Sequence, residues 1–225
     1  AGPFFAIDDD SWNRLTAALQ GRVRVDPATV AALEGVTSNL TTLFASAPPI
    51  VIRPLVDAQL NSLTQFLSNP APEELRRRLA SAAAETSIIA GWIAADGTNE
   101  SASAQHAYLM AIDAAKVADD RPMAAYAIAS ASCLPAWRSS PEDSIRLLLG
   151  NDDVSGFRAT DATPNVRAWV GSLLAEAHIR AGHQTEAWAA LDGAETMLNT
   201  PDPEPRPRLL VFIEASDKNH LAVQV

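Results

Sequence analysis

The amino-acid sequence predicts an all-α protein built from antiparallel helical hairpins. Three observations support this fold class. Apolar residues recur every three or four positions through most of the 225 residues, which is the spacing of one face of an α-helix. No segment shows the alternation of apolar and polar residues that a set of half-buried strands would need. Alanine is frequent on the expected helix faces, and it favours helices that pack closely.

The composition predicts a folded, cytoplasmic protein without a disulfide. Hydrophobic residues make up 48% of the chain and charged residues 20%, so a core can form. The net charge is −10, and because an acidic surface repels phosphates we expect this chain not to bind DNA by itself. Cys133 is the single cysteine, which fits a reducing compartment. The start of the chain lacks the regions of a signal peptide, and the longest apolar run, residues 88–95, is too short to span a bilayer.

Residues 1–69 are expected to form helices that cap one end of the protein. A short helix is predicted over residues 11–20, where Trp12, Leu15 and Leu19 share a face. Asp26 and Pro27 have the character of an N-cap and a first helical position. A second helix therefore begins there, and two prolines, Pro48 and Pro49, separate it from a third helix over residues 50–68.

Residues 70–200 are expected to hold the repeated helical hairpins. Prolines and the acidic Glu73 and Glu74 predict the start of a fourth helix. Capping residues and helix-breaking residues give the remaining boundaries. The fourth helix runs to about residue 95, a fifth is capped by Asn99 or Ser101, a sixth covers residues 122–137, and a seventh begins at residue 141. A loop over residues 151–163 and two helices in residues 166–201 follow. Alternating prolines in residues 201–207 predict a stiff linker. Residues 209–225 fit either a last capping helix or a strand.

The best-defined hairpin lies in residues 166–201. Gly182 breaks the chain between two helices whose facing positions are mostly apolar or small: Leu174, Ala175, His178, Ala187, Leu191 and Ala194. This pattern resembles a tetratricopeptide (TPR) repeat, which has a Leu, a small residue and a bulky residue on its first helix, a Gly at the turn, and Ala on its second. The resemblance implies a binding surface rather than a catalytic one.

Small residues suited to helix crossings recur along the chain. Gly91, Ser132 and Ala175 follow one another at intervals of roughly 40 residues, longer than the ~34 of a standard TPR and close to other helical-pair repeats. We therefore expect the middle repeats to be degenerate. Stacked hairpins of this kind bury their apolar faces against their neighbours and form an α-solenoid, a right-handed superhelix with an inner groove.

The order of segments is similar to that of one protein family. The segments are DPATVAALEGVTSNL from Asp26, PAPEELRRRLASAAAETSIIAGWIAADG from Pro70, a helix with Tyr108, and LAEAHIRAGHQTEA from Leu174. Together they resemble the C-terminal part of actinobacterial Xre-type helix-turn-helix regulators over residues 25–201. The resemblance implies a ligand- or peptide-sensing and dimerisation domain that reaches DNA only through a separate N-terminal domain absent from this chain. The alternative is a protein–protein adaptor without a DNA-linked role.

The resemblance also implies which residues face the groove. In such arrays the first helix of each pair lines the inner surface. Carrying the register of the last hairpin along the chain gives eight candidate ligand-binding residues: Glu85, Trp92, Tyr126, Cys133, Trp137, Trp169, Glu176 and Arg180. An aromatic-rich groove with a few charges suits a peptide or a small amphipathic effector. The alternative is that these tryptophans are ordinary core residues.

No motif in the sequence predicts catalysis, and we expect no enzyme activity. The patterns of a nucleophile elbow, a phosphate-binding loop and a dinucleotide fold are missing. His178 and His183 are separated by Gly182 and lack the helical spacing of metal ligands. Cys133 is expected to be a buried, inert thiol. We therefore expect no metal and no cofactor. We also expect a homodimer, because the ends of a solenoid are apolar unless they are capped and residues 209–213 leave one end open to a partner or a capping helix.

Overall fold

The computed structural model describes residues 25–97, 100–137, 140–150 and 162–201. This part of the chain is all-helical and contains no strand, which confirms the predicted fold class at that level. Its elements are α2 (Pro27–Phe44), α3 (Pro49–Leu67), α4 (Glu73–Trp92), the π-helical turn η1 (Ile93–Gly97), α5 (Ser101–Ala118), α6 (Arg121–Trp137), α7 (Pro141–Leu149), α8 (Pro164–Arg180) and α9 (Gln184–Leu198). The helix predicted over 11–20, most of the loop over 151–163, the linker after Pro201 and the tail over 209–225 lie outside the described residues.

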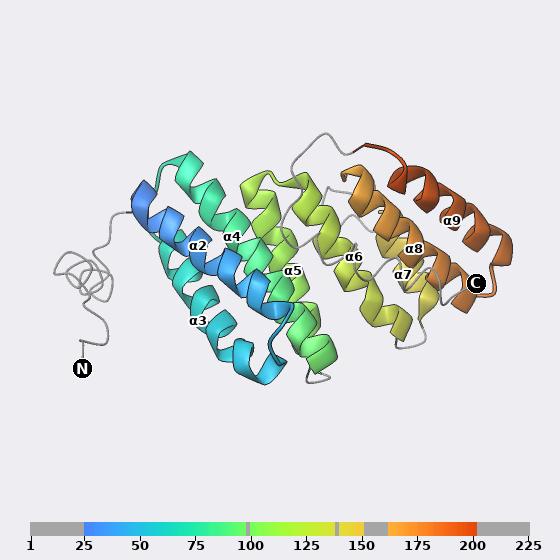
Figure 1. The fold of residues 1–225 in the computed structure, drawn as a ribbon, viewed down its shortest axis with the longest axis horizontal. Helices are drawn as coiled ribbons and strands as arrows, with labels where there is room; N and C mark the ends of the chain where they lie inside the picture. Colours follow the sequence, from blue (N-terminus) through green and yellow to red (C-terminus); the bar gives the residue numbers. More distant parts are fainter. Residues whose placement is uncertain (1–24, 98–99, 138–139, 151–161, 202–225) are drawn as a thin grey trace.

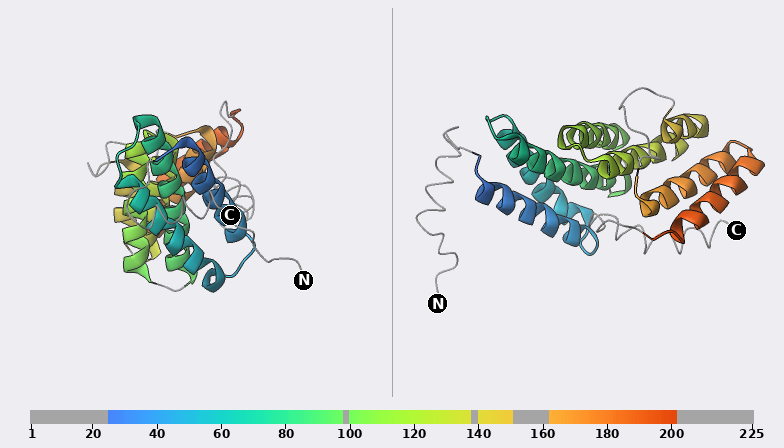
Figure 2. Two further views of the ribbon diagram at one scale, coloured as in Figure 1. Left: turned by 90° about the vertical axis from the view of Figure 1, so that its left-hand side faces the viewer. Right: turned by 90° about the horizontal axis from the view of Figure 1, so that it is seen from above.

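The helices lie side by side in chain order along the long axis of the molecule, from α2 at one end to α9 at the other (Figure 1). Seen from above, the row of helices is extended rather than bundled around one centre (Figure 2). From α3 onward each α-helix packs against the next one, and the pairs α4–α5 and α8–α9 are the most extensive. In addition, α2, α4, α6 and α8 contact one another in series. Alternate helices therefore form a continuous row.

The predicted helix ends are mostly confirmed by local hydrogen bonds. The carboxylate of Asp26 accepts from the amide of Thr29 at 2.7 Å, so Asp26 is the N-cap of α2. Gly182 has a φ of +81°, and the amide of His183 donates to the carbonyl of His178 at 2.8 Å. This is the glycine-dependent helix end that a sharp turn into α9 requires. Pro54 lies in the second turn of α3.

One hydrophobic core runs through most of the described chain. It joins Leu40 of α2 and Val56 of α3 to Ile88 of α4, Ile128 of α6 and Val170 of α8. A buried polar contact reinforces the N-terminal end. The amide of Gln59 donates to the carbonyl of Leu33 at 2.9 Å and to the hydroxyl of Thr37 at 3.1 Å. Residues 25–69 thus share their core with α4 rather than forming a separate unit.

Two glycines mark the closest helix crossings. A Cβ atom at Gly91 of α4 would stand 2.3 Å from the ring of Tyr108 in α5, so the small residue expected here is required by contact with an aromatic ring. In the last hairpin, a Cβ at Gly171 of α8 would stand 2.9 Å from the Cβ of Ala194 in α9. The two helices are therefore in close contact at Gly171, and Ala175, one turn later, is buried.

Candidate functional site

The three helices that carry the predicted groove residues follow one another in the row of alternate helices. The candidates come from α4, α6 and α8, and α6 contacts both α4 and α8. Tyr126 of α6 and Trp169 of α8 meet directly, with ring centroids 4.8 Å apart and planes inclined by 31°. Both rings belong to the main core, and their residues are only 6% and 9% exposed. These two aromatic residues therefore fix α6 against α8, and a ligand could contact their faces only if they moved.

Cys133 lies two turns beyond Tyr126 on α6 and is also buried. Its thiol donates a weak hydrogen bond to the carbonyl of Ala129 at 3.6 Å. Burial, with a contribution from the negative charge of Glu176, raises the pKa of Cys133 to about 12. At neutral pH the sulfur is therefore a neutral thiol, which is unsuited to nucleophilic or metal-binding roles.

The pKa of Cys133 leads to a direct prediction about thiol reactivity. At pH 8 a thiol with a pKa of about 12 has roughly a thousandfold less thiolate than an ordinary cysteine. We expect a disulfide reagent such as DTNB to label the native protein at least a hundredfold more slowly than the urea-unfolded protein. Equal rates would show that Cys133 lines an open groove.

Glu176 and Arg180 form the polar, solvent-facing part of the predicted set. They lie one turn apart on α8, with Arg180 Nη2 2.7 Å from Glu176 Oε1. The side chains are 20% exposed for Glu176 and 47% exposed for Arg180. A partly exposed pair contributes little to stability, and the half-exposed Arg180 can reorient toward a charged partner. Trp137 ends α6, and its side chain lies outside the described part of the structure.

Glu85 and Trp92 of α4 have contacts with α2 and α5, respectively. The hydroxyl of Thr41 in α2 donates to Glu85 Oε1 at 2.6 Å. The ring of Trp92 packs edge-on against Tyr108 of α5, with centroids 6.0 Å apart. The structure thus brings Tyr126 against Trp169, pairs Glu176 with Arg180, and places Glu176 near enough to Cys133 to affect its pKa. Glu85 contacts Thr41, and Trp92 contacts Tyr108 beside the main core. Ligand binding by any of the eight residues stays a prediction.

The structure also contains a pocket that the sequence did not indicate. It lies between α3, α4, η1 and α5 and has a volume of about 170 Å³. Its wall is largely apolar, with a few polar groups: Val56, Leu60, Ala90, Ile93, Ala94, Ala107, Met110, Arg53, Asp57, Ser87, Ser103 and His106. None of the eight predicted groove residues lies in this wall. The helical periodicity marks these apolar residues as core and gives no sign that they leave a space.

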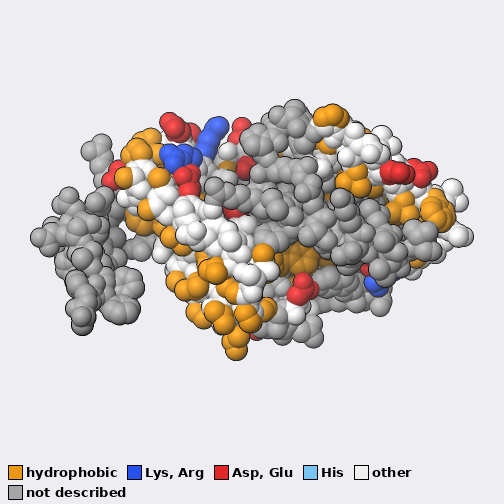
Figure 3. Space-filling model, viewed as in Figure 1, with side chains coloured by type: hydrophobic (Ala, Val, Ile, Leu, Met, Phe, Trp, Pro, Cys, Tyr) orange, Lys and Arg blue, Asp and Glu red, His pale blue; other side chains and the backbone are white. Residues whose placement is uncertain are grey.

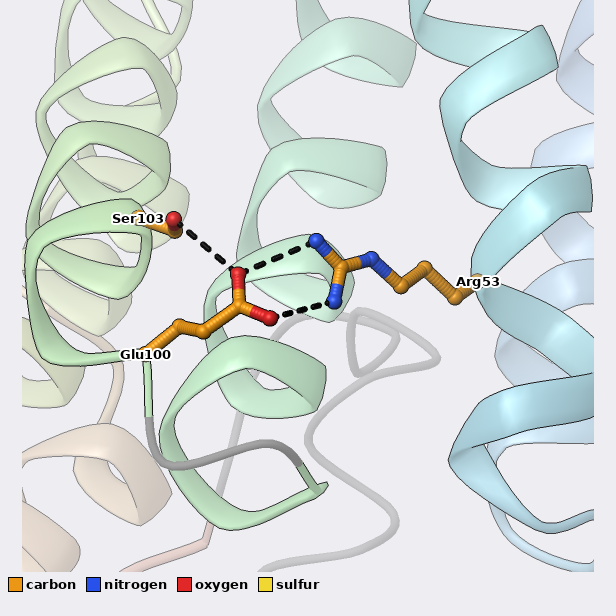
Figure 4. Close-up of polar contacts among 3 residues, drawn as sticks. All are labelled: Arg53, Glu100 and Ser103. Carbon is orange, nitrogen blue, oxygen red and sulfur yellow. Dashed lines mark hydrogen bonds and ion pairs between the residues drawn. The ribbon is translucent and has the colours of Figure 1, made fainter.

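An ion pair joins two walls of this pocket. Arg53 of α3 donates from Nη1 to Glu100 Oε1 at 2.7 Å and from Nη2 to Glu100 Oε2 at 3.0 Å (Figure 4). Ser103, in the first turn of α5, also donates to Glu100 Oε2, at 3.2 Å. The pair is bidentate, the geometry that makes Arg–carboxylate contacts specific. The two side chains are 41% and 39% exposed, so the pair links α3 to the start of α5 but contributes little to stability.

The histidines of the last hairpin come close to each other. The Nδ1 atoms of His178 and His183 are 3.4 Å apart. Desolvation and the proximity of His183 lower the pKa of His178. Within the described ranges, no three His, Cys, Asp or Glu residues come together in a way that could hold a metal ion, and no helix there is long and apolar enough to cross a membrane. Comparison with family models, curated proteins and solved structures found no match.

Proposed function

We propose that this chain is the ligand- or peptide-sensing and dimerisation domain of a cytoplasmic bacterial transcriptional regulator, with a degenerate TPR-like architecture. The observation that carries the proposal is the serial contact of α2, α4, α6 and α8, with α5 and α9 packed as second helices against α4 and α8. A repeat array needs this arrangement, because each hairpin buries its apolar face only against its neighbours. The small residues at the crossings, Gly91 and Gly171, support the same interpretation.

The effector surface of this domain is proposed to lie on the α6–α8 row. Trp169 and Tyr126 anchor the two helices there, and Glu176 and Arg180 provide adjustable charges beside them. An effector that binds one relative arrangement of α6 and α8 better than another would shift the population between two curvatures of the array. A DNA-binding domain joined to this chain would sense that change. The acidic net charge of −10 agrees with DNA contact being made elsewhere.

The coding sequence of the complete gene tests the regulator part of this proposal. We expect a helix-turn-helix segment to be encoded upstream of residue 1, in frame with this chain. In that case, the full-length protein should bind its own promoter DNA with a salt-dependent affinity. A complete gene without any DNA-binding segment would contradict the regulator role while leaving the binding role open.

A protein–protein adaptor is the second candidate, and one surface feature favours it. Apolar side chains are exposed around the start of α3, where Ile50 is 82%, Val51 57% and Leu55 48% exposed. Figure 3 shows hydrophobic side chains gathered over the α2–α3 connection, at the lower edge of that view. Contiguous exposed apolar groups of this kind are typical of protein-binding surfaces. An adaptor would co-purify with a protein partner rather than with a small effector.

A further inference from the structure

The pocket between α3, α4, η1 and α5 contains a buried polar group without a partner. Ser87 of α4 lines the pocket, is 1% exposed, and its Oγ has no hydrogen-bond partner among the described residues. Burying a hydroxyl without a hydrogen bond is unfavourable. Such groups are rare in folded proteins and call for an explanation such as a bound molecule. A ligand group placed beside Ser87 would supply the missing bond.

The size of the pocket limits what it can hold. Its volume is about 170 Å³, slightly above the roughly 150 Å³ of an engineered apolar cavity that binds benzene. Val56, Leu60, Ile93 and Met110 provide apolar walls from three sides. These dimensions fit one six-membered ring or a short branched chain.

The charges at the pocket favour an uncharged ligand. Arg53 is the guanidinium group in the wall, and it is already paired through both nitrogens with Glu100. His106 of α5 also lines the wall, at an exposed position. Asp57 is the further acidic group, and it is exposed on the next turn of α3. An anion would have to compete with Glu100 for Arg53 and would face Asp57. A cation would meet only an open carboxylate, which contributes little in water.

From these observations we propose that the pocket binds one small neutral molecule, with a single ring or short branched apolar body and one hydrogen-bonding group that pairs with Ser87. This site is separate from the predicted groove and shares no residue with it. The proposal holds whether the chain is a regulator's domain or an adaptor. Phenol is a suitable probe because it combines one ring with one hydroxyl, and toluene has nearly the same shape without the hydroxyl.

The methionine methyl groups of the chain can report ligand binding in an NMR experiment. It has three methionines: Met110 lines the pocket, Met123 lies in the main core, and Met197 lies in α9 at the far end of the molecule. With ¹³C-methyl methionine, a titration with phenol should shift the Met110 resonance in a saturable way and leave Met197 unchanged. Assignment of the three signals follows from Met110→Leu and Met197→Leu.

Two variants test the chemistry of the pocket. Ser87→Ala should weaken phenol binding by about three- to tenfold, the effect of one hydrogen bond, and leave toluene binding within about twofold. Because the variant removes a hydroxyl that has no bond, it should fold normally. Ala90→Leu places three extra carbon atoms in the space and should weaken both probes by more than tenfold. Ala58→Leu, at an exposed position of α3 outside the pocket wall, is the matched control and should bind both probes like the unaltered protein.

Benzoate and benzylamine test whether the pocket prefers a neutral ligand. Both should bind at least tenfold more weakly than phenol. Four results would overturn the proposal. The first is no change of the Met110 signal at millimolar phenol or toluene. The second is an equal shift of the Met197 signal. The third is an equal loss of phenol and toluene binding in Ser87→Ala. The fourth is tighter binding of either charged probe than of phenol.

Discussion

Gly91→Ala is expected to destabilise the protein by about 2–3 kcal/mol. The added methyl group would stand 2.3 Å from one ring carbon of Tyr108 and 2.6 Å from another, so α4 and α5 would have to move apart. Tyr108 is 1% exposed and cannot swing into solvent. For a protein of this size the change corresponds to a fall of about 5–10 °C in the midpoint of thermal unfolding, measured by circular dichroism.

Gly35→Ala is the matched control for this experiment. Gly35 is also a helical glycine, in α2, but a Cβ there meets nothing within 4 Å. Alanine is the better helix former, so this variant should be stabilised by about 0.5–1 kcal/mol. The two substitutions are chemically identical and have opposite expected signs. If both raise the midpoint, α4 and α5 do not cross at Gly91 as described.

Trp169→Ala is expected to destabilise the protein by about 3–5 kcal/mol, the usual cost of truncating a large aromatic side chain in a core. Trp169 is 9% exposed and stacks on Tyr126, so its removal leaves a cavity between α6 and α8. Urea unfolding monitored by circular dichroism measures the loss. The result distinguishes a core residue from a residue whose main role is to face an open groove.

Trp188→Ala in the same hairpin provides the comparison. Trp188 lies on α9 and is 51% exposed, so its truncation should cost less than about 1 kcal/mol. A small loss in both variants would mean that Trp169 is available to a ligand and that the α6–α8 contact is looser than its geometry indicates. A large loss only in Trp169→Ala supports its role as the anchor of that contact.

The sequence was most informative where local chemistry decides the structure. Asp26 caps α2 and Gly182 ends α8 because a carboxylate beside free amides and a residue with positive φ are local requirements. Gly91 could also be found from its spacing as a crossing residue. In the last hairpin, Ala175 was chosen from the same spacing and is buried, and Gly171 one turn before it also lies close to α9. A small residue one turn away satisfies the same pattern, so periodicity cannot separate them.

Features that depend on several helices at once could not be predicted in this way. Helix α8 packs against α6, α7 and α9, so most of its faces are covered and the periodicity does not show which side is open. For that reason the burial of Trp169 became visible only in the structure. The pocket beside Ser87 likewise depends on how α3, α4, η1 and α5 pack together, with Arg53 and Glu100 joining α3 to the start of α5. These residues are far apart in the sequence and carry no shared motif.

Native mass spectrometry of the protein purified from its own host tests the central claim, that this chain is a dimerising domain that binds an effector. We expect a dimer with a non-covalently bound molecule, which is lost at higher collision energy. The added mass should be that of a peptide or small molecule rather than of a protein. A monomer without any adduct, or a complex with an unrelated folded protein in place of the dimer, would contradict the account.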